Sequence, residues 1–117
     1  MERVLGIGGY FMRAADPAAL NSWYRECLGF DADENGMWQQ EAGPTVFATF
    51  DSDTDYFGST TQQTMLNFRV RDLDAMRAQL RSKGAGVAGD VQDMECVGRF
   101  GWVTDPEGNR IELWQPS

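Results

Sequence analysis

Two aspartates, Asp16 and Asp72, stand at the start of two similar segments and constrain the fold of this chain more than any other feature. Each follows an apolar stretch and precedes apolar residues at helical spacing. Aspartate is favoured at a helix N-cap because its carboxylate accepts backbone N–H bonds from the first turn. The 56-residue offset between them also aligns Arg13 with Arg69. The sequence therefore predicts an internal duplication.

Both units show the same order of elements, one strand, one helix and three strands. In the first unit we expect a strand over residues 5–13, a helix from Pro17 to Gly29, and strands at 30–33, 37–41 and 45–50. In the second unit we expect a strand over 64–70, a helix from Leu73 to near Gly84, and strands at 86–92, 99–104 and 110–115. Neither unit has enough sheet to be stable alone, so the two should share one curved surface.

Length and composition fit a single folded domain over residues 1–117, with modules at about 1–58 and 62–117. The hydrophobic fraction is 42%, and no apolar run approaches the roughly 20 residues that cross a bilayer. The net charge of −8 argues against nucleic acid and anionic membranes as partners. It is compatible with a cationic ligand, although acidic surfaces commonly serve solubility. We expect a cytoplasmic protein.

Histidine is absent from the chain, and only two cysteines, Cys27 and Cys96, are present. The absence removes the usual general base, the commonest transition-metal ligand and every Cys-His or Ser-His pair. Cys27 lies on the apolar face of the first predicted helix, which indicates packing. A reducing compartment also disfavours a disulfide.

The segment DPEGNRIELW predicts a tight turn followed by a half-buried strand. Alternation in that strand places Arg110, Glu112 and Trp114 on one face. Three roles are open for Glu112, which are metal ligand, general base and partner in a satisfied polar niche.

Three stretches together resemble the vicinal oxygen chelate superfamily, which includes glyoxalases, bleomycin-resistance proteins and dioxygenases. They are ADPAALNSWYRECLGF, FRVRDLDAMRAQLRSKG and GRFGWVTDPEGNRIELWQP, and the resemblance covers nearly the whole chain. It implies an α+β fold in which two tandem βαβββ modules form a curved mixed sheet around a cavity. It also implies frequent dimers, hence an expected homodimer, and a divalent metal in the family's enzymes.

The positions that resemble the family's metal ligands have mostly lost their donors in this chain. The two positions seven residues before the capping aspartates are Gly9 and Met65. The carboxylate of the final strand matches Glu112, whereas its counterpart in the first module falls on Phe47 or Thr49. Transition-metal sites need three or more convergent protein donors. We therefore expect no cofactor, with a divalent metal as the alternative, assisted by Asp93 or Glu95.

The acidic loop DSDTDYFG imitates the start of an EF-hand through Asp51, Asp53 and Asp55. It lacks the glycine at position six and the glutamate at position twelve, so we interpret it as a solvated loop. Tyr56 or Phe57 in this loop would either close over the cavity as a lid or anchor the loop.

Strand parity and the resemblance together predict the lining of the cavity. The predicted pocket residues are Phe11, Arg13, Tyr56, Met65, Asn67, Arg69, Phe100, Trp102, Glu112 and Trp114. This set is aromatic and apolar with a few polar points, the usual composition of a small-molecule site. Alternatively, these side chains only fill a barrel interior.

Two functions follow from this lining. In the first, the chain binds a small aromatic or cationic molecule without a metal, as bleomycin-resistance members of the family do. In the second, it is a lyase, isomerase or dioxygenase-type enzyme, with Glu112 as general base or residual metal ligand and Arg13 or Arg69 stabilising an oxyanion. A third interpretation gives Glu112 only a salt bridge to Arg13 or Arg69.

Overall fold

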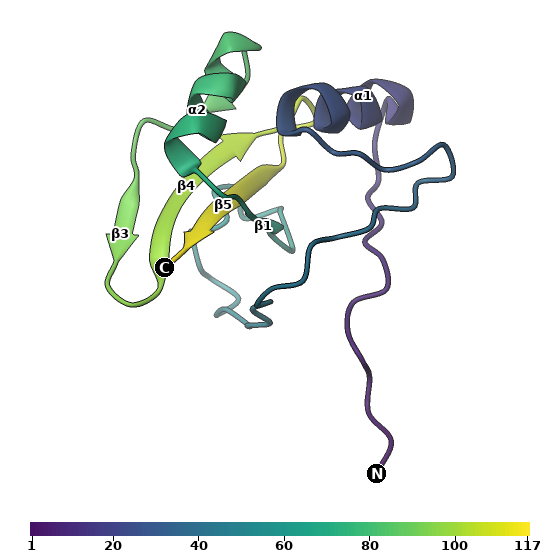
Figure 1. Cartoon of the computed structure of the whole chain (residues 1–117). Coiled ribbons are helices and arrows are strands. Elements are labelled where there is room, and N and C mark those ends of the chain that lie inside the picture. Colours follow the sequence, from purple (N-terminus) through teal and green to yellow (C-terminus); the bar gives the residue numbers. More distant parts are fainter.

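The computed structural model describes all 117 residues, as two helices on one side of a curved five-stranded sheet (Figure 1). In chain order the elements are α1 (Pro17–Leu28), β1 (Asn67–Arg69), α2 (Leu73–Ser82), β2 (Gly86–Val87), β3 (Gln92–Met94), β4 (Gly98–Thr104) and β5 (Arg110–Pro116). This is the expected α+β fold with a curved mixed sheet, here a single open sheet. Neither helix has the length and apolar character that crossing a membrane requires.

The two helices begin in the same way, as the duplication predicts. Oδ1 of Asp16 accepts a hydrogen bond from the N–H of Ala19 at 3.1 Å, and Oδ1 of Asp72 accepts one from Ala75 at 3.0 Å. The first helix ends at Gly29, whose φ of 74° is the left-handed conformation that glycine adopts without penalty. Both predicted N-caps are therefore confirmed.

The sheet is built around the antiparallel pair of β4 and β5. The strand order is β1-β5-β4-β2, with β3 also pairing with β4, and β1 lies parallel to β5. One face of the sheet carries Val103, Ile111 and Leu113, each about 1% exposed or less. These side chains pack with Leu73 and other residues of both helices in the hydrophobic core. The opposite face of the sheet does not pack against the helices, so its side chains can form a separate site.

The turn between β4 and β5 also holds α1 in place. Glu107 accepts hydrogen bonds from the N–H groups of Ala15 at 2.9 Å and Asp16 at 3.1 Å. Asp105, which is buried, accepts one from the hydroxyl of Tyr24 at 2.8 Å. Burial and this hydrogen bond to Asp105 raise the pKa of Tyr24 above its ordinary value. The two acids of the turn thus fix the helix of the first unit to the sheet of the second.

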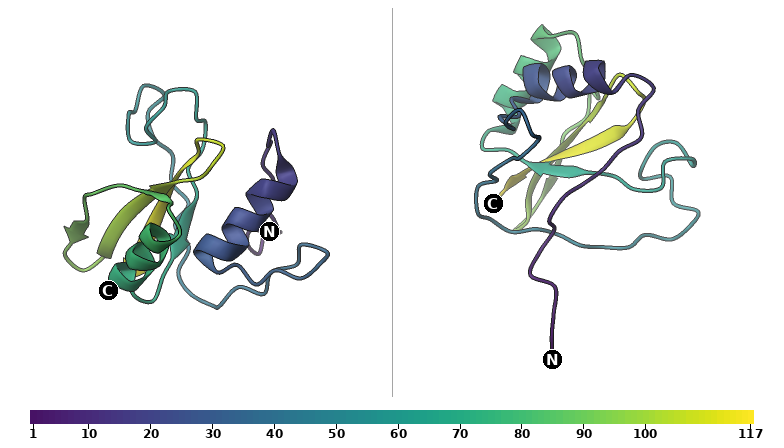
Figure 2. Two further views of the ribbon diagram at one scale, coloured as in Figure 1. Left: turned by 90° about the horizontal axis from the view of Figure 1, so that it is seen from above. Right: turned by 90° about the vertical axis from the view of Figure 1, so that its right-hand side faces the viewer.

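The strands expected in the first unit do not form, and this part of the prediction is wrong. Residues 5–13, 30–33, 37–41 and 45–50 contain no strand. Residues 1–15 and 38–50 make no backbone-to-backbone hydrogen bond at all. A strand exists only beside another strand, and these segments run past the sheet without meeting a free edge (Figure 2). In the second unit the predicted strand over 86–92 is also split, into β2 and β3.

These extended segments hold most of the exposed large hydrophobic residues of the molecule. Of the 14 exposed large hydrophobic residues, 12 lie within residues 1–50. Leu5 and Phe11 are 97% and 93% exposed, and Phe47 is 88% exposed. Figure 2 shows the N-terminal segment running away from the body of the protein. The sheet of the first unit is thus absent, while the side chains suited to it remain exposed.

Candidate functional site

The sheet face opposite the helices brings together six of the predicted pocket residues. The Cα positions of Asn67 and Glu112 are partners across β1 and β5, and those of Trp102 and Glu112 are partners across β4 and β5. The next pairs along the strands are Arg69 with Trp114 and Phe100 with Trp114. Partnered side chains lie on the same face of a sheet. The six residues therefore share one surface, as strand parity and the resemblance together predict.

Glu112 is the centre of this surface, is only 7% exposed and accepts three hydrogen bonds. Its Oε1 accepts a bond from Nδ2 of Asn67 at 2.7 Å. Its Oε2 accepts one from Nε1 of Trp102 at 3.1 Å and another from the hydroxyl of Tyr56. Of the three roles open for Glu112, these contacts match that of a partner in a satisfied polar niche.

Aromatic rings surround the carboxylate. The ring of Tyr56 lies edge-to-face with Trp102, with ring centroids 6.2 Å apart, and stacks on Phe50 at 5.3 Å. Further along the strands, Phe100 and Trp114 are parallel to within 2° with centroids 6.1 Å apart. Burial, together with the hydrogen bond to Glu112, raises the pKa of Tyr56. Tyr56 is therefore a neutral donor, and the aromatic rings, with Trp102 and Trp114 themselves only 6% and 7% exposed, enclose one buried acid.

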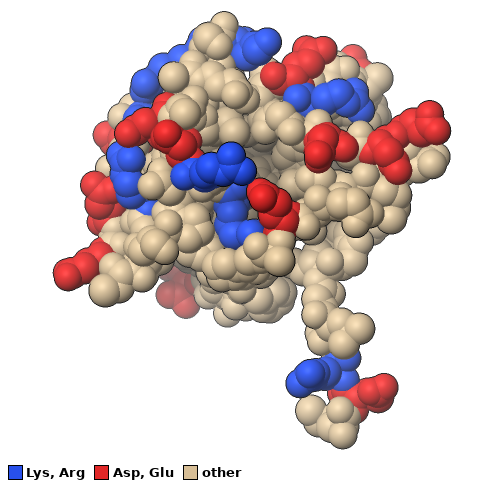
Figure 3. Space-filling model, viewed as in Figure 1, with Lys and Arg blue, Asp and Glu red and all other residues tan.

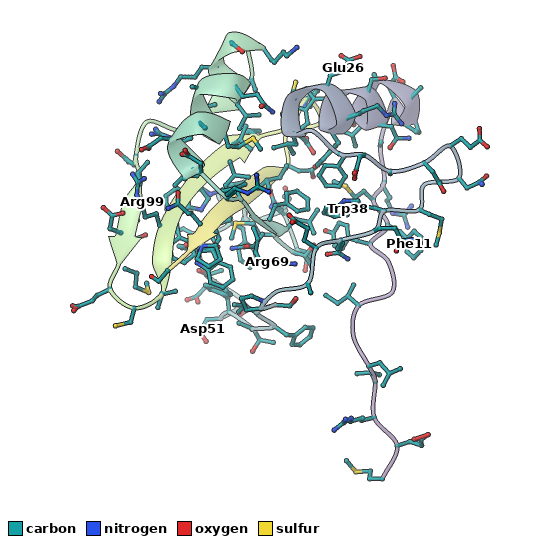
Figure 4. All side chains as sticks on the ribbon, viewed as in Figure 1. Phe11, Glu26, Trp38, Asp51, Arg69 and Arg99 are labelled. Atoms are coloured by element: carbon teal, nitrogen blue, oxygen red, sulfur yellow. The ribbon has the colours of Figure 1, made fainter.

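The third interpretation of Glu112, a salt bridge to Arg13 or Arg69, is wrong. Both ion pairs in the structure belong to Arg99, with Asp74 and Asp93. The guanidinium of Arg69 instead donates to the backbone oxygen of Glu41 at 2.8 Å, which ties the first unit to β1 (Figure 4). Because neutral donors already surround Glu112, it needs no cationic partner.

Arg110 is the cation that contacts an aromatic ring of this surface. Its guanidinium carbon lies 5.1 Å from the centre of the Trp102 ring, in a cation–π arrangement. Elsewhere acidic and basic side chains are interspersed over the face seen in Figure 3. No single acidic patch on that face marks a docking site for a cation.

The remaining predicted pocket residues lie elsewhere or at the margin. Phe11 and Arg13 are exposed on the N-terminal segment, away from any strand, and Figure 4 shows Phe11 beside that segment. Phe11 lines a hollow of about 240 Å³ under α1, shared with Tyr10, Leu20 and Tyr24. Met65 is half-buried just before β1. In this single chain the sheet surface therefore lacks the wall that residues of the first unit were expected to supply.

A second hollow, of about 80 Å³, lies between the end of α1 and β1. Its walls include Phe30, Trp38 and Phe68, and the ring centroids of Phe30 and Trp38 are 4.3 Å apart. Binding sites for small molecules usually enclose about 300–1,000 Å³. Both hollows are smaller than that, and neither includes Glu112.

The donors on this surface do not fit the divalent metal of the family's enzymes. Such a metal needs several convergent acceptors, and here Glu112 is surrounded by the donors Asn67, Trp102 and Tyr56. Gly9 and Met65 supply no oxygen or nitrogen side chain. No group of three Asp, Glu or Cys side chains in the structure is arranged to hold a metal ion. Asp93, one of the two residues expected to assist a metal, is paired with Arg99 instead.

Sequence reasoning missed Gln62 and Phe50, and it did not include Arg110 among the pocket residues. Gln62 donates to the backbone oxygens of Thr64 and Arg110, both at 2.9 Å, and accepts from the N–H of Arg110 at 2.8 Å. It thereby fastens the end of the loop of Tyr56 to the start of β5. A glutamine in a polar loop has no pattern that reveals such a role, whereas the alternation of β5 already placed Arg110 beside Glu112.

Comparison with known proteins agrees with this geometry. A family model described as "Glyoxalase-like domain" matches residues 10–114. No curated protein matches the chain. The structure is similar to that of TnmS3, an antibiotic binding protein from Streptomyces sp. CB03234, with 25% identity, a TM-score of 0.66 and complete coverage of both chains.

Two further solved structures show the same fold. A glyoxalase/bleomycin resistance protein from Streptomyces sp. CB03234 is 27% identical, with a TM-score of 0.55 over 86% of this chain and 92% of that one. TioX from Micromonospora sp. ML1 is 20% identical, with a TM-score of 0.58 over 89% of this chain and 93% of that one. The chain therefore belongs to the glyoxalase-like domain family of the vicinal oxygen chelate superfamily.

Proposed function

We propose that this protein binds a small aromatic molecule on the sheet face around Glu112 and does so without a metal. The observation that carries the proposal is the pairing of flat aromatic side chains with one buried, hydrogen-bonded carboxylate. Trp102 and Trp114, which are buried in the unliganded chain, supply apolar area for stacking once the side chains that cover them move aside, and Glu112 supplies a fixed acceptor that orients a bound molecule.

The similarity to TnmS3 supports this function. That protein is described as antibiotic binding, and it matches the present chain along its whole length at 25% identity. An antibiotic-like aromatic compound is therefore the ligand class that we propose. Binding alone, with no chemical step, would suffice to sequester such a compound.

The contacts of Glu112 support binding rather than catalysis. Both of its oxygens accept hydrogen bonds from neutral donors, which suits a carboxylate that holds a donor in place rather than one that removes a proton. The loss of donors at Gly9 and Met65 likewise favours a site that works without a metal.

We further propose that a second copy of the chain completes the site. Residues 5–13 and 45–50 keep the side chains of strands but have no neighbouring strand within their own chain. A sheet edge in a second copy would satisfy their backbone groups and cover their apolar side chains. The wall expected from Phe11 and its neighbours would then face the surface around Glu112.

Fluorescence and calorimetric titration with a panel of aromatic antibiotics and simpler neutral and cationic aromatic compounds tests the binding function. We expect at least one saturable ligand whose affinity falls about tenfold or more in Trp102→Phe, because the indole loses both area and its bond to Glu112. The matched variant Trp23→Phe, on α1, should stay within about twofold of wild type, since Trp23 lies on the helix side. Absence of binding across the panel would contradict the proposal.

A further inference from the structure

Tyr56 reaches Glu112 from a loop that has no helix or strand of its own. The loop follows Asp51, which Figure 4 labels below the sheet, and is fastened at its far end by Gln62. Between these points Tyr56 is held to the sheet by its hydroxyl and by ring contacts. The phenol side chain is thus presented to the sheet surface from outside it.

The surroundings of this phenol are those expected for a bound ligand. One side of its ring stacks on Phe50, at an interplanar angle of 16°, and its edge meets Trp102 at 84°. Its hydroxyl donates to Oε2 of Glu112, beside the indole N–H of Trp102. Ring and donor are therefore recognised separately, the ring by aromatic faces and the donor by the carboxylate.

The charges nearby distinguish between classes of aromatic ligand. The guanidinium of Arg110 over Trp102 disfavours a second cation at this point. An anionic ligand would in turn be repelled by the carboxylate of Glu112. A neutral ring with a hydroxyl donor meets neither penalty. It can also make the contacts that Tyr56 makes, a hydrogen bond to Glu112 and a ring contact with Trp102.

We propose that the site around Glu112 is specific for phenols, and that Tyr56 occupies it as an internal phenol that the ligand displaces. This inference rests on the proposed binding function and adds the chemical class of the ligand. The ligand hydroxyl takes the place of the Tyr56 hydroxyl on Oε2 of Glu112, and its ring lies against Trp102. The loop moves aside with Tyr56, while Gln62 keeps its far end attached.

The test uses Tyr56→Ala, which removes the internal phenol, and two probes that differ by one donor. Phenol has the ring and the hydroxyl, whereas anisole has the same ring with the hydroxyl methylated. Binding is followed by the indole N–H signals in ¹⁵N-resolved NMR spectra. We expect Tyr56→Ala to bind phenol about tenfold or more tightly than anisole, because a bond to a charged acceptor is among the stronger kind. Wild type should bind phenol more weakly than the variant does, since Tyr56 competes.

Two further variants keep the inference falsifiable. Adding Glu112→Gln to Tyr56→Ala should reduce the preference for phenol over anisole to within about threefold. Tyr56→Phe keeps the ring and loses only the donor, so it should bind phenol more tightly than wild type even if the alanine variant does not fold. The matched control is Ser82→Ala on α2, which removes a hydroxyl bonded to the backbone oxygen of Gln79 and should leave phenol binding unchanged.

The outcomes separate this inference from the proposed function. Equal affinity for phenol and anisole, or no gain of phenol affinity in Tyr56→Phe, would overturn the inference even if wild type binds other aromatic compounds. If wild type binds nothing in the larger panel but Tyr56→Ala prefers phenol, the recognition of phenols stands and the proposed antibiotic-binding function fails.

Discussion

The hydroxyl of Tyr24 donates a 2.8 Å hydrogen bond to Oδ2 of Asp105, across 81 residues of sequence. Both side chains are buried, at 9% and 4% exposure. Asp105 also accepts bonds from the N–H of Asn109 and from Nδ2 of the same residue. The aspartate that shapes the turn is thus the one that holds α1, so the turn and the docking of the helix depend on a single side chain.

Tyr24→Phe should lower the free energy of unfolding by about 1.5–3 kcal/mol, the usual range for a hydrogen bond to a charged group. The ring is retained, so the packing loss is small. Urea unfolding followed by tryptophan fluorescence measures the change. Tyr10→Phe is the matched control, because its hydroxyl bond to Thr64 is exposed, and it should cost less than about 1 kcal/mol. Equal losses in the two variants would contradict the importance given to Asp105.

The raised pKa of Tyr24 also predicts how stability depends on pH. An unfolded tyrosine loses its proton near pH 10, whereas the folded Tyr24 keeps its proton to a higher pH. The stabilisation is therefore complete below pH 10 and declines above it, by up to about 1.4 kcal/mol per pH unit for each such group. Unfolding curves between pH 9.5 and 11.5 should show a shallower decline in Tyr24→Phe than in wild type. Parallel declines would be inconsistent with this assignment.

Local chemistry explains which parts of the fold could be predicted from sequence. The caps at Asp16 and Asp72 depend on residues three positions away, and the alternation in β4 and β5 depends on period two, so both were predicted correctly. Asn67 was placed beside Glu112 by the same parity, and Trp102 by the resemblance to the family. The prediction of strands in the first unit was wrong because a strand must pair with the edge of another strand, and no local sequence pattern reports whether such an edge is in reach.

The candidate site likewise has one part that local sequence predicts and one part that it does not. Tyr56 and Glu112 are 56 residues apart, and nothing in DTDYFG distinguishes a lid from an anchor. Gln62, which fixes the loop, resembles any polar residue of a surface loop. The sheet half of the site was therefore predictable by parity, whereas the loop half depended on tertiary contacts.

Glu112→Gln should lower the free energy of unfolding by about 1–3 kcal/mol. The amide brings two donors of its own among three existing donors, so at least one buried group loses its acceptor. Thermal and urea unfolding measure the effect. Glu95→Gln is the matched control in the exposed turn between β3 and β4 and should change stability by less than about 0.5 kcal/mol. A neutral effect of Glu112→Gln would contradict the network as described.

Removal of any bound metal should change neither the stability of the protein nor its affinity for a ligand. If Glu112 serves only as a hydrogen-bond acceptor, dialysis against a chelator should leave both the melting temperature and the affinity for an aromatic ligand unaltered. Added Zn²⁺, Ni²⁺ or Mn²⁺ should likewise fail to raise the melting temperature, since a bound metal stabilises the folded state by mass action. Elemental analysis of the purified protein completes the measurement. A stoichiometric metal, or a rise of several degrees with one of these ions, would refute the metal-free proposal.

The exposed apolar segments predict a second copy of the chain in solution. Sedimentation equilibrium at tens of micromolar should give twice the chain mass of 13.1 kDa. Phe47→Lys should give the single-chain mass, because an 88% exposed side chain contributes little to the fold of one chain but would be covered in the assembly. Met94→Lys, also at an exposed apolar position but outside these segments, should still give twice the chain mass. A wild-type protein with the single-chain mass would mean that the surface around Glu112 is completed within one chain, and the proposed role of the partner would fall with it.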